Sequence, residues 1–167
     1  MKRIVLLTIT LALCLAMVGC GGGVATLTVS QIPWPDGEET GYVIQDQDGN
    51  EIGTAEMTIS RDGDTYEMTF DMVIGDSTDS ILMTLNADDL KPISETRTIY
   101  IPTAGTYELN AGFSDNQITV EAETPDGHEG PLTFDIPADS FANDEVWYLF
   151  RTLPFEEGYT ATYTNVI

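Results

Sequence analysis

His128 is the single histidine of the chain and the first residue to consider for acid–base chemistry. It lies in the segment Asp-Gly-His-Glu-Gly (126–130), whose composition predicts an exposed loop. A histidine beside a glutamate can act as a general base, but no serine or cysteine has a recognisable nucleophile setting. Carboxylate pairs of the glycosidase kind stay open, because 28 Asp and Glu make any one pairing uninformative. We therefore expect no enzyme and no catalytic residue, with a cell-wall or glycan hydrolase as a minor alternative.

Residues 46–51 (DQDGNE) have the spacing of calcium ligands at their start. Asp46, Asp48 and Asn50 occupy alternate positions, as in the first half of an EF-hand loop. The pattern then fails, because Glu51 stands where that loop needs glycine. A solvated hairpin turn explains the segment better. We expect no metal site and no cofactor, and these three residues remain only a weak calcium candidate.

An apolar patch is the strongest candidate for ligand binding. Four of the six methionines fall on the predicted inward faces of three consecutive strands, beside aromatic and aliphatic residues. Methionine is flexible and polarizable, and it lines adaptable apolar sites. Two interpretations stay open: the patch walls a pocket for a lipid or another hydrophobe, or it is core beneath a helix. The candidate residues are Met57, Tyr66, Met68, Phe70, Met72, Ile81, Met83 and Leu85.

Period-two alternation of apolar and polar residues positions this patch. Asp-Gly pairs, which suit tight hairpin turns, begin at Asp36, Asp48, Asp62 and Asp126. Such alternation predicts an antiparallel sheet with one dry face and one wet face, and hence a mainly-β fold. The expected strands cover residues 41–45, 50–60, 64–74, 77–85, 93–101, 106–113, 116–123 and 131–136.

One helix is expected between Asn143, a plausible N-cap, and Pro154, which cannot continue a helix. We expect Trp147 and Tyr148 to cover the sheet beside the helix's apolar stripe, and the chain to become extended again over 159–166. The stripe follows helical spacing and consists of Val146, Leu149, Phe150 and Leu153.

The first twenty residues have the pattern of an export signal. Two basic residues precede 15 mostly apolar ones (4–18), whereas a helix needs about 20 to span a bilayer. Residues 17–20 (MVGC) resemble a bacterial lipobox, with Met17 in place of the usual leucine. The resemblance implies that Cys20 carries a diacylglycerol thioether and begins the mature chain; an ordinary secretory signal or an uncleaved anchor is the alternative. The expected organisation is a signal peptide (1–19), a lipidated N-terminus with a tether or first strand (20–37), and the sheet domain (38–167).

Four short motifs link the sheet domain to a known group: residues 52–55 (IGTA), 90–92 (LKP), 153–155 (LPF) and 158–159 (GY). With them, residues 38–166 resemble a family of bacterial envelope domains of unknown function, itself similar to the periplasmic lipoprotein carriers and their outer-membrane receptor. The resemblance implies a strongly curved antiparallel sheet, a half-barrel whose hollow can hold acyl chains. That family's sheet usually continues for several strands past the position of Tyr159. The sheet is therefore expected to be smaller here, completed by a partner, or incomplete at the C-terminus.

The charge balance excludes several functions. A net charge of -22 leaves no cationic face for nucleic acid or for adsorption to anionic lipid. We expect a non-enzymatic, lipid-anchored envelope protein that binds a hydrophobic ligand (an acyl chain, a lipid or a lipoprotein) on the concave face of the sheet. The alternative is an interaction module with a filled core that docks a protein partner. The expected location is the outer membrane if the host has one, and otherwise the outer face of the cytoplasmic membrane; the oligomeric state stays open.

Overall fold

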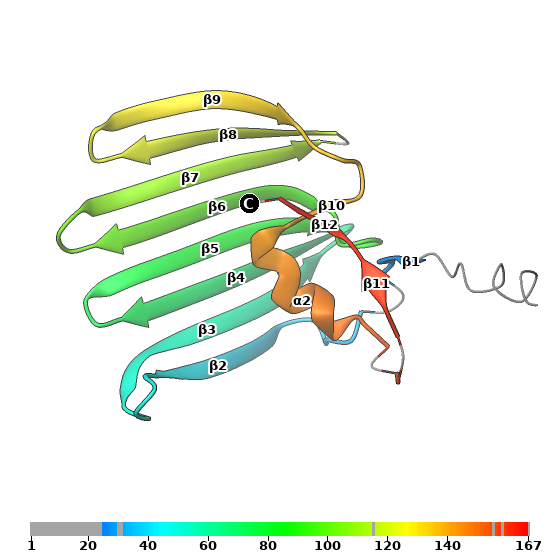
Figure 1. The fold of residues 1–167 in the computed structure, drawn as a ribbon, viewed down its shortest axis with the longest axis horizontal. Helices are drawn as coiled ribbons and strands as arrows, with labels where there is room; N and C mark the ends of the chain where they lie inside the picture. Colours follow the sequence, from blue (N-terminus) through cyan, green and yellow to red (C-terminus); the bar gives the residue numbers. More distant parts are fainter. Residues whose placement is uncertain (1–24, 30–31, 115, 155, 158, 167) are drawn as a thin grey trace, which may run out of the picture. The chain divides into compact units, whose positions relative to one another are not determined.

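The computed structural model describes residues 25–29, 32–114, 116–154, 156–157 and 159–166. The expected signal peptide and Cys20 lie outside these residues. Eight strands form one antiparallel meander whose spatial order follows the chain (Figure 1). In the described chain the first and last of these strands do not pair with each other, so the sheet is open. The strands are β2 (Glu38–Gln45), β3 (Glu51–Asp62), β4 (Thr65–Ile74), β5 (Ser77–Asn86), β6 (Pro92–Ile101), β7 (Gly105–Ser114), β8 (Gln117–Thr124) and β9 (Gly127–Asp135).

The cross-strand register sorts the side chains of this sheet onto two faces. Met57 lies opposite Phe70, which lies opposite Ile81, and a neighbouring row joins Met68 to Met83. We call the face that carries these five residues the helix face, because the short helix packs on it. The prediction of a mainly-β fold with one apolar face is confirmed, and all eight expected strands are present.

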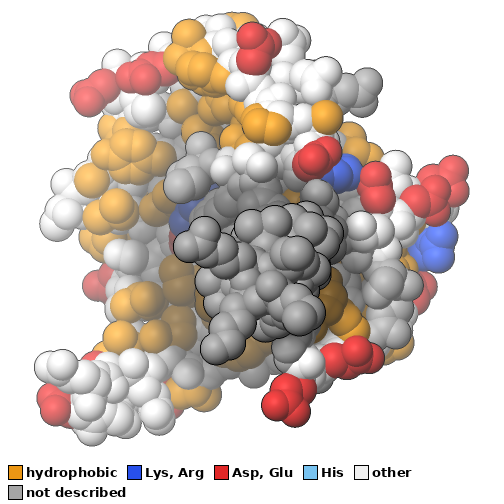
Figure 2. Space-filling view, turned by 45° about the vertical axis from the view of Figure 1, so that its right-hand side comes forward, with side chains coloured by type: hydrophobic (Ala, Val, Ile, Leu, Met, Phe, Trp, Pro, Cys, Tyr) orange, Lys and Arg blue, Asp and Glu red, His pale blue; other side chains and the backbone are white. Residues whose placement is uncertain are grey.

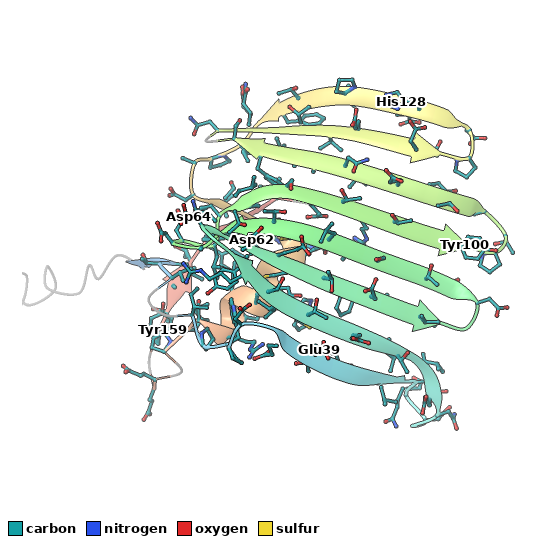
Figure 3. The ribbon with its side chains drawn as sticks, turned by 180° about the vertical axis from the view of Figure 1, so that it is seen from behind. Glu39, Asp62, Asp64, Tyr100, His128 and Tyr159 are labelled. Atoms are coloured by element: carbon teal, nitrogen blue, oxygen red, sulfur yellow. The ribbon has the colours of Figure 1, made fainter. Side chains whose placement is uncertain are left out.

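The opposite face, here called the polar face, is built mainly from hydroxyl, amide and carboxylate side chains, with a few exposed apolar residues such as Leu82 and Val73 (Figure 3). Figure 3 shows Glu39 on β2, Tyr100 on β6 and His128 on β9. Polar pairs join neighbouring strands: the hydroxyls of Thr58 and Thr69 lie 2.7 Å apart, and in three further pairs a hydroxyl is hydrogen-bonded to a hydroxyl, amide or carboxylate oxygen of the next strand. Those pairs are Thr96–Asn110, Thr119–Thr133 and Ser80–Asp71.

After β9 the chain crosses onto the helix face. It forms β10 (Ser140–Ala142), a 3₁₀ turn η1 (Asn143–Glu145) and the helix α2 (Val146–Arg151), and then β12 (Thr164–Val166), which pairs in parallel with β10. Asn143 is not the N-cap that the sequence predicted. The Glu145 carboxylate caps the turn instead, because its Oε1 accepts the backbone N–H of Ala142 at 2.9 Å.

The side of α2 that faces the sheet also differs from the expected stripe. Tyr148 and Leu149 are buried, but Phe150 is 41% exposed, and Trp147, which was expected to cover the sheet, is 69% exposed. The buried residues keep helical spacing but begin one position earlier than expected, at Glu145, and continue with Tyr148, Leu149 and Thr152. Tyr148 covers the sheet as predicted, whereas Trp147 does not.

A second, smaller unit consists of β1 (Ala25–Thr26) and β11 (Ala161–Thr162). The two strands pair in parallel, and the backbone N–H of Leu27 extends the pairing by donating to the carbonyl of Thr162 at 2.8 Å.

Position 53, in the IGTA motif, must be glycine for a steric reason. A Cβ atom built on Gly53 would lie 2.1 Å from the carbonyl oxygen of Val73 on β4. No side chain can occupy that position unless the two strands separate, so the motif records a close backbone approach.

Two leucines of β5 test the assignment of the faces. Leu85 is fully buried, whereas Leu82 is 43% exposed on the polar face. We expect Leu85→Ala to lower the free energy of unfolding by about 2–5 kcal/mol and Leu82→Ala by less than about 1 kcal/mol. Urea unfolding followed by tryptophan fluorescence measures both. Equal losses would contradict the face assignment.

Candidate functional site

The helix face is not completely covered, and α2 lies between two apolar hollows. The first, here the β2–β4 hollow, has a volume of about 510 Å³. It is lined by Tyr42, Ile44, Ala55, Met57, Phe70, Met72, Trp147 and Arg151. The second, here the β6–β9 hollow, has a volume of about 640 Å³. Its apolar wall consists of Leu109, Ala111, Phe113, Ile118, Val120, Leu132, Phe134 and Ile136. Figure 2 shows hydrophobic side chains gathered at the top of the view, at the height of β8 and β9.

The eight predicted pocket residues share the helix face, but they have two different environments. Met57, Phe70 and Met72 line the β2–β4 hollow. Met57, Phe70, Met72 and Ile81 also line a small cavity of about 110 Å³ beside α2. The other four are buried core residues that are at most 6% exposed: Tyr66, Met68, Met83 and Leu85. Met57 and Ile81 are nearly as buried, at 7% and 8%, so only Phe70 and Met72 are partly exposed. The patch is therefore part core and part hollow wall.

The wall of the larger hollow was not among the residues predicted from the sequence. Leu132 and Phe134 on β9 are 57% and 53% exposed, although both belong to the helix face. The same alternation that marked the methionines is present in Ile118 and Val120 on β8. This alternation predicts an apolar face on β8 as well, but the prediction of a pocket rested on methionine content, which is high only in β3–β5.

An ionic cluster lies between the hollows. The guanidinium of Arg97 donates from Nε to Asp79 Oδ1 at 2.9 Å and from Nη2 to Asp79 Oδ2 at 2.6 Å. Its Nη1 donates to Asp144 Oδ2 at 3.3 Å. These bonds raise the pKa of Arg97, and they tie β5 and β6 to the turn that begins the helical segment. Charged groups on an otherwise apolar face require such pairing.

Two glutamates beside this cluster have raised pKa values. Burial raises the pKa of Glu95 to about 7; the negative charge of Asp144 acts in the same direction, and Arg97 opposes it. Burial also raises the pKa of Glu145 to about 9. Glu145 is fully buried, and among the described residues its Oε2 has no hydrogen-bond partner. Both side chains therefore hold protons that exposed glutamates would lose.

Polar and aromatic contacts hold α2 in place. Arg151 at its end donates to Glu38 on β2 at 2.5 and 3.1 Å. The Tyr148 hydroxyl donates to the carbonyl of Thr69 at 3.1 Å, and its ring meets the buried Trp34 edge-on at 6.2 Å. At the other end, Lys91 Nζ donates to the carbonyl of Ser140 at 3.2 Å and lies 3.6 Å from the centre of the Phe141 ring. Lys91 belongs to the LKP motif, so one function of that motif is to fix the crossing segment.

The remaining candidates of the sequence analysis lie on exposed parts of the sheet. His128 is in strand β9 and not in a loop; its Nδ1 lies 2.8 Å from Glu123 Oε1 on β8, and this contact raises its pKa. Asp46 accepts the backbone N–H groups of Asp48 and Asn50 at 2.9 Å, so its carboxylate is engaged in closing the turn. Among the described residues, no three His, Cys, Asp or Glu side chains converge to hold a metal ion.

Comparison with protein families adds one finding. The model of a family described as a protein of unknown function (DUF3108) matches residues 41–166, and the chain belongs to that family. Comparison with curated proteins and with solved structures gave no match. Within the described part of the chain, no helix has the length and hydropathy needed to cross a membrane.

The raised pKa of Glu95 predicts a pH-dependent stability. From about pH 4.5 to about pH 7 the folded state keeps a proton that the unfolded state releases. This contribution to stability is therefore complete at low pH and is lost as the pH rises to about 7. We expect the unfolding free energy of the wild type, measured against Glu95→Gln, to fall by up to roughly 3 kcal/mol over that range. Urea unfolding at several pH values measures it. Glu56→Gln on the polar face is the control for loss of one carboxylate, and a flat wild-type difference would contradict the burial of Glu95.

Proposed function

We propose that this protein is a non-enzymatic, lipid-anchored protein of the bacterial envelope that binds a hydrophobic ligand on the helix face of its sheet. The hydrophobic ligand is an acyl chain, a lipid or a lipoprotein. The β6–β9 hollow is the observation that carries the proposal. Its volume of about 640 Å³ falls within the range of ligand pockets, and its wall is apolar with a few polar groups at one end.

The distribution of exposure supports the same proposal. Exposed apolar side chains are ordinary when they are scattered, but Leu109, Leu132 and Phe134 are each at least 37% exposed and lie together on one face. Burying them against a ligand chain would gain roughly 25 cal/mol for each Å² removed from water.

The anchor part of the proposal rests on the N-terminal sequence. Lys2 and Arg3, the apolar stretch 4–18 and the MVGC motif support lipid attachment at Cys20. Two or three acyl chains on one residue bind firmly, because each buried methylene contributes about 0.8 kcal/mol. The acidic composition would keep the domain away from anionic headgroups while the anchor holds it.

A second candidate function is an interaction module that docks a protein partner. The observation in its favour is the pair of edge strands, β2 and β9, which do not pair with each other in the described chain. Such edges present free backbone groups to another strand. Recovery of one stoichiometric partner, without bound lipid, would favour this alternative.

Substitution in the β6–β9 hollow tests ligand binding. We expect lipid extracted from the purified full chain, quantified by mass spectrometry, to fall at least about fivefold in Leu132→Asp, because a carboxylate on the apolar wall must be desolvated by a bound chain. Leu82→Asp is the matched control, since Leu82 is an exposed leucine of the polar face. Equal lipid content in the wild type and both variants would contradict binding in this hollow.

Substitution of Cys20 tests the anchor separately. We expect the wild type, expressed in a bacterial host, to partition into the detergent phase with an N-terminal mass increased by the lipid. Cys20→Ser removes the thiol that would form the thioether and should give no such mass increase. Cys14→Ser is the control, because Cys14 lies within the expected signal peptide. An unmodified N-terminus in the wild type would refute the anchor.

A further inference from the structure

The β6–β9 hollow has one apolar wall and one ionic end. Glu95, Arg97 and Asp144 line it together with the aliphatic and aromatic residues of β7–β9. A single chain lying along the apolar wall would therefore place a head group within reach of these three side chains. The charge at this end decides which head group fits.

The cationic member of the ionic end is already paired with acids, and three of its five N–H donors are engaged. Nε and Nη2 of Arg97 are engaged by Asp79, and its Nη1 by Asp144. Two carboxylates already balance this one guanidinium. A ligand carboxylate or phosphate that approached the remaining N–H groups would lie beside these two acids at the edge of an apolar surface, and their negative charges would repel it.

Glu95 adds a third acid. Asp144 and Arg97 are the charged groups that shift the pKa of Glu95. Glu95 in turn raises the pKa of Glu145, which lies in the same 3₁₀ turn as Asp144. The cross-strand neighbours of Glu95 in the sheet are uncharged: Met83 of β5 and Ala111 of β7. Lys91 is held by the carbonyl of Ser140 and acts on Glu145. Asp79 and Asp144 outnumber Arg97, so the ionic end is negative, and Glu95 adds a further negative charge once it loses its proton, at about pH 7.

We infer that the β6–β9 hollow selects aliphatic ligands with a protonated amine as head group over the same chains with an anionic head group. This inference rests on the proposed function and specifies its ligand class. The apolar wall of β7–β9 takes the chain, and the carboxylates of Glu95 and Asp144 accept hydrogen bonds from the amine. The net charge of -22 on the whole chain also attracts a cation from a distance.

Three ligands of equal chain length show the effect of the head group on affinity separately from the effect of the chain. Binding of n-decylamine, n-decanol and decanoate to the purified full chain is measured by titration calorimetry. Leu132→Asn, which makes the wall polar without adding a charge, is the blank for uptake by detergent or by the anchor. We expect the amine to bind at least about tenfold more tightly than decanoate, with the alcohol between them. Binding of decanoate as tight as that of the amine would overturn the inference and leave the proposed function standing. If none of the three binds above the blank, both are overturned.

The variant Glu95→Gln tests whether Glu95 selects the head group. The substitution keeps the shape of the side chain and removes its charge. We therefore expect it to lower the affinity for decylamine at least about fivefold, while the affinity for decanol changes far less. In the wild type the affinity for decylamine should rise from about pH 6 to about pH 8, as Glu95 loses its proton, and in Glu95→Gln it should stay level. The amine itself stays protonated throughout this range. A wild-type affinity for decylamine that is independent of pH and equal to that of Glu95→Gln would show that Glu95 does not select the head group.

Discussion

The pairing of Arg97 with Asp79 and Asp144 is the contact on which the arrangement of the helix face depends. It joins two strands of the sheet to the turn before α2, at distances of 2.6 to 3.3 Å. A charge on such a face is tolerated only with its partners, and the loss of one partner typically costs several kcal/mol. The pairing therefore fixes the position of the turn before α2, and the position of α2 divides the face into two hollows.

The crossing segment needs these external contacts because α2 has little stability of its own. A helix of six residues is far below the length at which isolated helices persist in water. Arg151 with Glu38, Tyr148 with Thr69 and Lys91 with Ser140 hold it from three other points. Its place on the sheet is thus determined by residues distributed over β2, β4 and the turn before β6. Local helix propensity contributes little to it.

The contrast between local signals and contacts from distant residues explains how far the sequence could predict the structure. The strands were predictable, because alternation and Asp-Gly turns are local signals that repeat along the chain. The ionic cluster was not, because Asp144 lies 47 residues from Arg97 and no spacing rule connects them. The methionine patch was placed on the correct face. Which part of it is core and which part lines a hollow depends on the position of α2, and that position depends on the cluster.

The two hollows consequently differ in what a ligand would meet. The β2–β4 hollow lies beside the core and is bordered by Trp147 and Arg151 of α2 itself. The β6–β9 hollow extends over the last three strands of the meander, where the crossing segment leaves Leu132 and Phe134 exposed. The proposed acyl-chain site and its head-group selectivity both belong to the second.

The position of β9 has a mechanical consequence. In the described chain this strand pairs on one side only, with β8, and it also forms the outer rim of the β6–β9 hollow. An edge strand separates from its neighbour more easily than a strand that is paired on both sides. If the proposed ligand were larger than the hollow, β9 would therefore move first, while the methionine-rich strands β3–β5 kept the domain folded. Ligand capacity and stability would then depend on different halves of a single sheet.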